Sequence, residues 1–454
     1  MAAIEFSNKR NFLMECEYHY TLQDVEEPEL HREMFPYGEI PKCTFNLRLT
    51  PQNPPDEIWI TDTTFRDGQQ SRAPYTPKQI VDLYKMLHKL GGYRGIIRQS
   101  EFFLYSDTDK QALRMCQDLG YKYPEITGWI RARKEDFALA KDMGLKECGI
   151  LVSCSDYHIF KKLKMNRRQA MDTYLGIVKD ALDAGIRPRC HFEDITRADF
   201  YGFVVPFATQ LSMLMQETGI PIKIRACDTM GYGVPYPGAS MPRSVPGIIY
   251  GLSVYGGFPS SLLEWHGHND FYKAVTNSAC AWLYGASGVN CSLLGIGERT
   301  GNTPLEAMVI EYAQLRGTLD GMDTTVIRDI ADYYENEIGH KIWDKMPFVG
   351  RDFNVTHAGI HADGMQKDEE IYNIFDTEKL LKSPPSVSIS KTSGAAGIAM
   401  WLTRHLKSET PIPKGDERVQ KLKEWVDAQY EAGRVTTIGK DELAQVGRTM
   451  GILD

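Results

Sequence analysis

The chain has 454 residues, of which 42% are hydrophobic and 25% charged, and its formal net charge is −8. This composition is ordinary for a globular protein, and no Lys/Arg block long enough for a nucleic-acid surface appears. Nine cysteines without Cys-x-x-Cys spacing argue against a disulfide framework and a structural zinc knuckle. The first ten residues lack a signal-peptide core, and Pro and Gly interrupt the charge-free run 244–263. We therefore expect a cytoplasmic protein with no membrane or nucleic-acid partner.

Residues 1–56 are polar and aromatic and end in the Pro-rich run 50–55, so we expect an irregular extension on the outside of the main domain. From residue 57 onward, runs typical of strands alternate with runs typical of helices. The expected strands cover 57–60, 95–97, 125–130, 148–152, 187–192, 221–227, 263–268 and 289–294. The expected helices between them include 77–89, 134–143, 166–184 and 271–284.

Eight strand–helix units predict a (β/α)8 TIM barrel, an α/β fold that carries its chemistry at the C-terminal ends of its strands. We expect this barrel over 57–317, with Thr76 as the N-cap of the first helix and Pro77 at its first position. After residue 317 the alternation stops. Helical patterns at 324–338, 419–430 and 440–450, with a Gly-rich loop at 356–364, predict a mostly helical appendage over 318–454.

Two of the expected strand ends carry metal-binding side chains. His266 and His268 follow the seventh strand, and residues two apart on a strand point the same way. They would form one chelating edge, and Asp67, after the first strand, is the carboxylate we expect to join them. Asn302 could add a metal or substrate oxygen, or cap the following helix. The plainer alternative is that one His caps a helix and the other fills a polar gap.

Three motifs carry a resemblance to a known family. They are Asp62-x-Thr64-x-Arg66-Asp67-Gly68-x-Gln70, His266-x-His268-Asn269-Asp270 and the run Gly-Ile-Gly-Glu-Arg-Thr-Gly-Asn at 295–302. Together they resemble the acyl-transferring TIM-barrel metalloenzymes, which include isopropylmalate, homocitrate, citramalate and Re-citrate synthases and, more distantly, hydroxymethylglutaryl-CoA lyase. The likeness runs from about residue 57 to 397. It implies acetyl-CoA as co-substrate, a small 2-oxo acid as the other substrate, and a homodimer.

The resemblance also implies roles for individual residues. Asp67, His266 and His268 would hold a divalent ion, for which mixed oxygen and nitrogen ligation favours Mn²⁺ or Mg²⁺ over Co²⁺ or Zn²⁺. Arg66 would stabilise an enolate, although a plain ion pair with Asp67 is the alternative. The remaining assignments are a general base from His361 oriented by Glu193, proton transfer assisted by Tyr372, and substrate contacts from Gln70, Arg131, Thr229 and Arg225. The alternative for His361 is that a glycine-rich loop merely exposes it.

The sequence departs from the family pattern in two segments that we expect to determine substrate specificity. The run 65–70 reads Phe-Arg-Asp-Gly-Gln-Gln, and Arg-Gln-Ser-Glu-Phe-Phe at 98–103 replaces the usual Glu-x-Gly-Phe-Pro. Arginines expected at strand ends, Arg98, Arg133 and Arg225, would pair with a second substrate carboxylate, unless they only bridge to surface carboxylates. With no room for a long regulatory domain, the pattern is most similar to the Re-citrate synthases, which use oxaloacetate. Homocitrate synthesis from 2-oxoglutarate is the alternative.

Two other functions are weighed against this one. A lyase of the hydroxymethylglutaryl-CoA type would carry a reactive Cys in the strand-eight loop, where this chain reads Gly-Ile-Gly-Glu at 295–298. A catalytically silent barrel that senses acyl-CoA would not need Arg66, Glu193 and His361 together. Both alternatives are therefore disfavoured.

Overall fold

A computed structural model describes residues 4–7, 12–15 and 20–453 of the chain. The chain divides into two compact units, Met1–Asp323 and Thr324–Asp454. Cys16 lies outside the described residues, and the other eight cysteines are free thiols. Among the described residues, no helix has the length and apolar character needed to cross a membrane.

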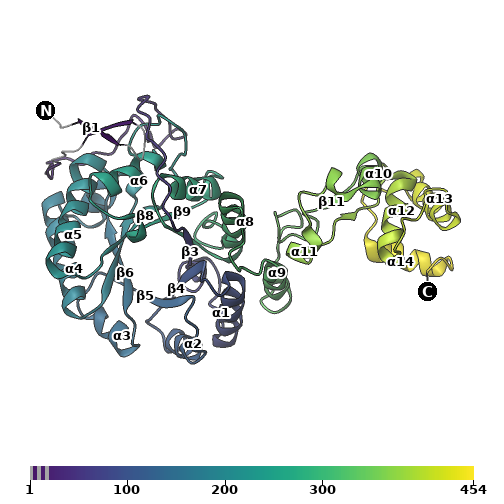
Figure 1. The fold of residues 1–454 in the computed structure, drawn as a ribbon, viewed down its shortest axis with the longest axis horizontal. Coiled ribbons are helices and arrows are strands. Elements are labelled where there is room, and N and C mark those ends of the chain that lie inside the picture. Colours follow the sequence, from purple (N-terminus) through teal and green to yellow (C-terminus); the bar gives the residue numbers. More distant parts are fainter. Residues whose placement is uncertain (1–3, 8–11, 16–19, 454) are drawn as a thin grey trace. The chain divides into compact units, whose positions relative to one another are not determined.

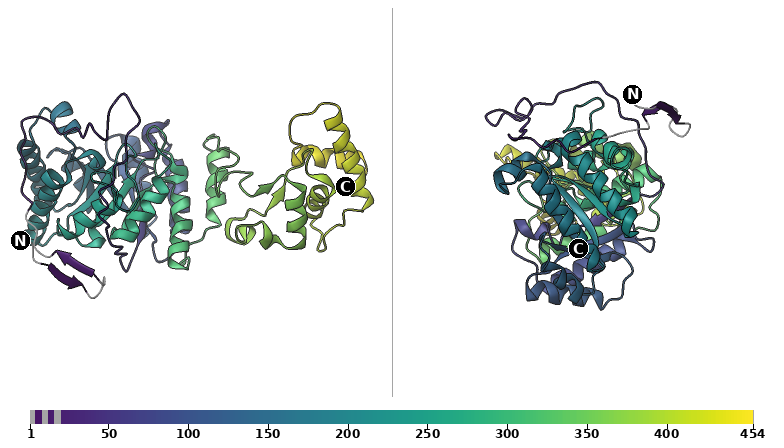
Figure 2. Two further views of the ribbon diagram at one scale, coloured as in Figure 1. Left: turned by 90° about the horizontal axis from the view of Figure 1, so that it is seen from above. Right: turned by 90° about the vertical axis from the view of Figure 1, so that its left-hand side faces the viewer.

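The first unit is a closed barrel of eight parallel strands, which confirms the expected α/β barrel. The strands are β3 (Trp59–Asp62), β4 (Ile97–Phe103), β5 (Glu125–Ile130), β6 (Glu147–Ser153), β7 (Arg187–Glu193), β8 (Lys223–Asp228), β9 (Leu263–Gly267) and β10 (Gly288–Cys291). Each strand pairs with the next along the chain, and β10 pairs with β3 to close the ring. Helices surround the strands (Figures 1 and 2).

The barrel helices are α1 (Pro77–Gly91), α2 (Asp107–Gln117), α3 (Asp136–Asp142), α4 (Arg167–Asp183), α5 (Val205–Thr218), α6 (Val245–Val254), α7 (Ala274–Tyr284) and α8 (Leu305–Arg316). The expected start of α1 is confirmed. Thr76 Oγ1 accepts the Gln79 N–H at 3.2 Å, the Gln79 side chain accepts the Thr76 N–H at 3.0 Å, and Pro77 opens the helix. This capping box satisfies two backbone donors at the helix start.

Two expected strand limits are wrong. The second strand was expected to end at residue 97, but β4 runs to Phe103, which places Arg98 near the start of the strand rather than at the rim. Arg98 instead lies over the Trp59 ring, with its Cζ atom 4.9 Å from the ring centroid. The eighth strand was expected to reach residue 294, but β10 ends at Cys291 because Leu294 adopts a left-handed backbone, φ 56°, within a short 3₁₀ turn.

The second unit is mostly helical. It contains α9 (Val326–Asn336), β11 (Val355–Thr356), α10 (Gly359–Lys367), α11 (Thr377–Leu381), β12 (Ser386–Val387), α12 (Gly394–His405), α13 (Glu417–Glu431) and α14 (Lys440–Thr449). The Gly-rich loop expected at 356–364 is wrong in its second half, because α10 begins at Gly359. A Cβ at Gly359 would lie 2.6 Å from the Ser393 carbonyl oxygen. Glycine is therefore needed there for close approach of two backbones rather than for a flexible loop.

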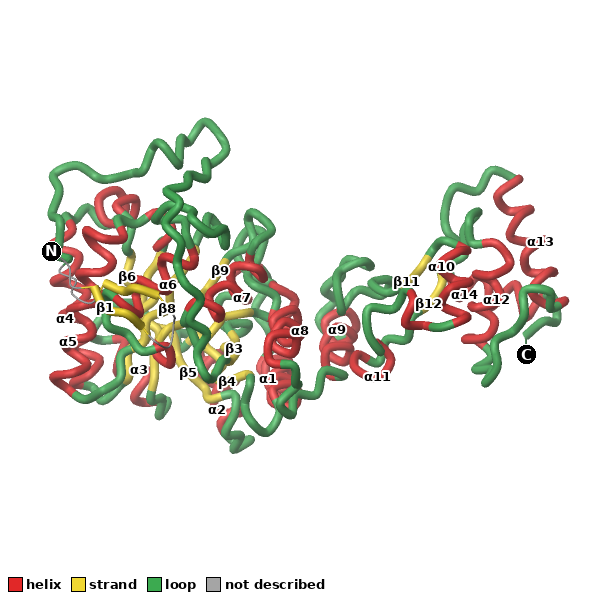
Figure 3. Tube along the Cα trace, turned by 45° about the horizontal axis from the view of Figure 1, so that its top comes forward, coloured by secondary structure: helices red, strands yellow, loops and turns green. Residues whose placement is uncertain are grey.

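Residues 4–7 and 12–15 form a small antiparallel pair, β1 (Ile4–Ser7) and β2 (Phe12–Glu15). The segment that follows, from residue 20 to β3, runs as a long loop over the barrel (Figure 3). Arg167, a fully buried residue at the start of α4, holds this loop. It donates to Asp156 at 2.7 and 3.0 Å, and its Nη1 donates to the Gln23 carbonyl oxygen at 2.9 Å.

Replacing Arg167 with Met is expected to lower the free energy of unfolding by about 3–5 kcal/mol, because the buried Asp156 carboxylate loses its guanidinium partner. Urea denaturation of the purified protein measures this loss. Lys134→Met is the control, since its ion pair with Asp180 lies on the surface and its removal is expected to change nothing measurable. Equal losses in the two variants would contradict the buried-pair explanation.

Candidate metal centre and active site

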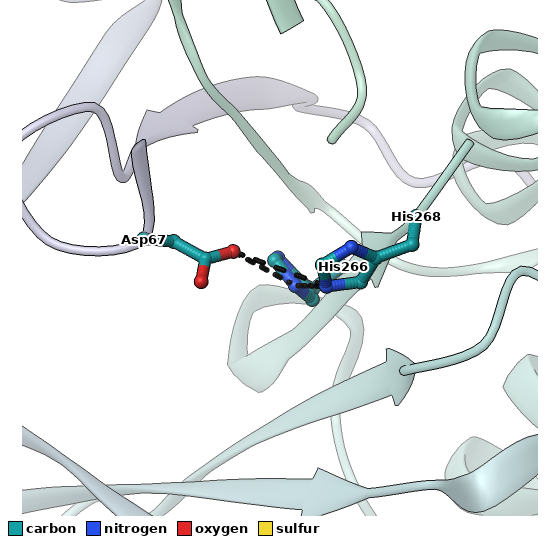
Figure 4. A group of neighbouring side chains, drawn as sticks. All are labelled: Asp67, His266 and His268. Atoms are coloured by element: carbon teal, nitrogen blue, oxygen red, sulfur yellow. Dashed lines mark hydrogen bonds and ion pairs between the residues drawn. The ribbon is translucent and has the colours of Figure 1, made fainter. Parts of the chain in front are cut away.

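Asp67, His266 and His268 converge at the C-terminal ends of the barrel strands (Figure 4). Asp67 Oδ2 lies 3.5 Å from His266 Nε2 and 3.9 Å from His268 Nε2, and the two Nε2 atoms lie 3.2 Å apart. All three side chains are buried. They meet because β9 pairs with β10 and β10 pairs with β3, so the turn after β3 and the end of β9 lie at one edge.

Local hydrogen bonds shape the turn that carries Asp67. Asp62 Oδ1 accepts the Thr64 N–H at 3.0 Å, the pattern of an Asx-turn. The Arg66 and Gly68 N–H groups both donate to the Thr63 carbonyl oxygen at 3.1 Å. The chain therefore reverses immediately after β3, and Asp67 faces back over the end of the barrel.

The tautomer of His266 leaves a lone pair on Nε2. Asn290 Nδ2 donates to Thr61 Oγ1 at 3.0 Å, so Asn290 Oδ1, 2.8 Å from His266 Nδ1, is an acceptor for the Nδ1–H. Burial, reinforced by the neighbouring His268 and Arg66, lowers the pKa of His266 to about 3 despite the opposing effect of Asp67. Burial also lowers the pKa of His268. Two imidazoles in the neutral form that metal binding requires then face a carboxylate, which is a suitable donor set for a divalent cation.

Asp67 is ionised. Burial alone would raise its pKa, but Arg66, His266 and His268 lower it to about 2. Asn302 Nδ2 donates to Asp67 Oδ2 at 2.8 Å, and its own Oδ1 is buried without a hydrogen-bond partner among the described residues. This orphaned oxygen lies beside the carboxylate and is available as a further ligand to a cation or a substrate.

The loop that presents Asn302 requires glycine at its turn. The Asn302 N–H donates to the Gly295 carbonyl oxygen at 2.8 Å. Gly301 has φ 98°, and a Cβ there would lie 2.1 Å from the same Gly295 oxygen. No other residue could make this turn without moving Asn302 away from Asp67.

Arg66 lies beside the Asp67 carboxylate. Its Nη1 donates to Asp67 Oδ1 at 3.2 Å, and its Nε donates to Glu101 Oε2 at 2.8 Å. The guanidinium carbon lies 5.6 Å from the Trp129 ring centroid. The ion pair with Asp67 that the sequence left as an alternative therefore exists, and it orients the guanidinium within the site.

Glu193, at the end of β7, has a local partner that the sequence reasoning missed. It accepts a hydrogen bond from Ser153, and its Oε2 lies 3.1 Å from His158 Nδ1 and 3.6 Å from Lys162 Nζ. Burial alone would raise the pKa of Glu193, but His158, Ser153 and Lys162 lower it to about 2. His158 follows β6 in a short π-helix, Tyr157–Lys162. Active-site residues of a TIM barrel lie after the strand ends, so the position of His158 in the sequence was the signal that could have identified it.

His361 and Tyr372 belong to the second unit. Their ring centroids lie 4.3 Å apart, and both line a cavity of about 420 Å³. The structure thus groups Glu193 with His158 in the first unit, and His361 with Tyr372 in the second.

The four residues expected to contact substrate have different surroundings. Thr229 Oγ1 accepts the Asp194 N–H at 2.8 Å, and Gln70 is exposed in the turn after Asp67. Arg131 is half exposed and forms a two-point ion pair with Asp136 at 2.9 and 3.0 Å. Arg225 is fully buried and donates to Glu264 and Glu101 at 2.8 and 3.1 Å. Only its Nη2 has no partner among the described residues.

Comparison with known proteins agrees with the fold and the motifs. A family model described as HMGL-like matches residues 57–333. The chain belongs to the HMGL-like family. A citrate (Re)-synthase of Clostridium kluyveri is 58% identical over 95% of this chain and 96% of its own length. A citrate (Re)-synthase of Syntrophus aciditrophicus is 59% identical over 94% of this chain and 68% of its own.

A barrel of the same fold is also present among solved structures. HMG-CoA lyase of Bacillus subtilis matches with a TM-score of 0.50 and 17% identity over 64% of this chain and 96% of its own. At this identity the likeness concerns the barrel fold alone.

Asn290→Ala is expected to weaken binding of a divalent metal about 10- to 100-fold, because His266 loses the acceptor that fixes its tautomer and ring orientation. Titration of the metal-free protein with Mn²⁺ measures the change. Asn354→Ala is the matched control, since Asn354 is a hydrogen-bonded Asn in the second unit, donating to Thr377 and Ser383 at 3.0 and 2.8 Å. Similar weakening in both variants would trace the effect to general destabilisation.

Proposed function

We propose that this chain is a citrate (Re)-synthase, which joins acetyl-CoA to oxaloacetate and releases citrate and CoA. The observation that carries the proposal is the 58% identity to a citrate (Re)-synthase over nearly the full length of both chains. The donor set of Asp67, His266 and His268 supports it, because a family reaction of this kind needs a bound metal ion.

A divalent cation held by Asp67, His266 and His268, with Asn302 beside it, would polarise the keto group of the 2-oxo acid. We propose Mn²⁺ for this site, with Mg²⁺, Co²⁺ and Zn²⁺ as alternatives. The presence of a carboxylate and an orphaned amide oxygen in the donor set favours the harder ions.

The side chains of the protein carry the proton and charge transfers. In the proposed reaction, His361 takes a proton from the acetyl methyl group, with Glu193 orienting the imidazole and Tyr372 assisting the transfer. Arg66 stabilises the enolate oxygen that forms, because a guanidinium stays charged at any working pH. The enolate carbon then bonds to the keto carbon of oxaloacetate, the keto oxygen takes up a proton, and water cleaves the thioester to release CoA.

Oxaloacetate carries two carboxylates, and the second needs a positive partner in the site. We assign Arg225 to this carboxylate, with Thr229, Gln70 and Arg131 as further substrate contacts. The support for Arg225 is its unpartnered Nη2, a buried donor in the barrel interior. A dicarboxylic 2-oxo acid is therefore favoured over a branched apolar one, and 2-oxoglutarate is the natural comparator.

Release of free thiol from acetyl-CoA, measured with a panel of 2-oxo acids, tests the substrate. We expect thiol and citrate with oxaloacetate only. Thiol with 2-oxoglutarate would instead indicate homocitrate synthesis. No thiol with any acid would contradict an acyltransferase and favour the sensing barrel.

Two His substitutions separate metal binding from proton transfer. His268→Ala is expected to remove the metal and abolish turnover, because one of the facing imidazoles is lost. His361→Ala is expected to abolish turnover and leave the metal content unchanged. Elemental analysis of both purified variants measures this, and equal metal loss would mean that His361 is not the base.

A further inference from the structure

Glu101 lies on β4 inside the barrel, and its side chain is only 1% exposed. Its Oε2 accepts hydrogen bonds from Arg66 Nε at 2.8 Å and from Thr63 Oγ1 at 3.1 Å. Its Oε1 accepts from Arg189 Nη2 and, at 3.1 Å, from Arg225 Nη1. One carboxylate thus receives three guanidinium groups and a hydroxyl. Burial would raise its pKa, but the three arginines hold that pKa well below its usual range, so Glu101 is ionised.

Two of these arginines hold Glu101 in place from deeper in the barrel. Arg189 Nη1 donates to Glu147 Oε1 at 2.8 Å, and Arg225 Nε donates to Glu264 Oε2 at 2.8 Å. Both acceptors are themselves buried. Moving the Glu101 carboxylate would therefore require breaking charge-assisted hydrogen bonds in a water-poor interior, where each is strong.

The third arginine, Arg66, bonds directly to Asp67, one of the candidate metal ligands. Glu101 holds its Nε and Asp67 holds its Nη1, and because the guanidinium is planar these two bonds fix its plane. The remaining nitrogen, Nη2, makes no hydrogen bond with the described part of the chain. The guanidinium therefore keeps N–H groups available on Nη2, while its plane is held by the Glu101 carboxylate, which is itself fixed by Arg189 and Arg225.

We propose that Glu101 is a positioning residue for Arg66. By accepting the hydrogen bond from Arg66 Nε, it fixes the guanidinium so that the free N–H groups of Arg66 meet the oxyanion formed in the reaction. This inference rests on the proposed function, which gives Arg66 its role. In this role Glu101 acts on the reaction through the orientation of Arg66 rather than as a group that reacts with substrate. The plainer alternative is that Glu101 merely neutralises arginines in the barrel interior, in which case its loss would reduce stability without a specific effect on turnover.

The test compares Glu101→Gln with Glu147→Gln in the thiol-release assay. Glu147 is the matched control because it is a buried barrel carboxylate, 1% exposed and paired with Arg189 and Lys223 at 2.8 and 3.1 Å. Within the described part of the chain it makes no hydrogen bond or ion pair with Arg66. We expect Glu101→Gln to lower kcat about 100-fold, the loss typical of a misplaced catalytic group. The KM for acetyl-CoA and the metal content are expected to stay within about twofold. Glu147→Gln, which reaches Arg66 only through Arg189 and Glu101, is expected to lower kcat far less than Glu101→Gln.

A double-mutant cycle with Arg66→Lys separates positioning from a structural role. A lysine has no guanidinium plane for Glu101 to orient, so we expect Glu101→Gln to lower kcat by less than about twofold further in that background. A full additional loss there, or an equal loss of kcat in Glu147→Gln, would overturn the inference.

A milder variant serves if Glu101→Gln does not fold. Thr63→Val removes one hydrogen bond that fixes the carboxylate and keeps its charge, and it is expected to lower kcat about fivefold, again without effect in the Arg66→Lys background. An unchanged kcat would overturn the inference. If the wild-type protein is active and Glu101→Gln is equally active, only this inference fails. If the wild-type protein releases no thiol with any acid, the proposed function fails and takes the inference with it.

Discussion

The pairing of β10 with β3 is the contact on which the site depends. It sets Asn290 opposite Thr61 and Cys291 opposite Asp62, and so brings the first and last strands of the barrel into register. The Asn290 side chain contacts both neighbouring strands, because it donates to Thr61 on β3 and accepts from His266 on β9. The candidate metal centre is therefore assembled by barrel closure, because Asp67 and His266 lie far apart in sequence and are brought to one edge by the pairing of β3, β10 and β9.

Beneath the metal centre the barrel interior is ionic rather than apolar. Glu101, Arg189 and Arg225 form one connected set, continued downward by Glu147 and Glu264. Buried charges are costly unless each is paired, so such a set tolerates few rearrangements. A rigid set of paired charges suits the proposed site, which would hold a cation and a dicarboxylate substrate, because the charged groups are oriented before substrate arrives.

The barrel and the metal triad could be predicted from the sequence because both rest on strong local signals, namely strand–helix alternation and motifs at strand ends. The features that the sequence did not predict have physical causes. β4 carries Arg98, Gln99 and Glu101, so it does not resemble an apolar strand, although Gln99 and Glu101 face an ionic barrel interior. Helix α10 contains two glycines and reads as a loop until packing against Ser393 is known. Asn290 looks like any strand residue, and its role appears only when β9 and β10 are seen side by side.

The long loop after residue 20 is joined to the catalytic rim by the segment around His158. The Glu29 N–H donates to Asp156 at 2.7 Å, the Tyr157 hydroxyl donates to the Leu30 carbonyl oxygen at 2.8 Å, and the next residue, His158, meets Glu193. The loop after residue 20 therefore contacts the segment that holds Glu193, a proposed catalytic carboxylate. A shortened or fused N-terminus that displaced Glu29 and Leu30 would therefore also disturb Asp156 and Tyr157, and through them the position of His158 beside Glu193.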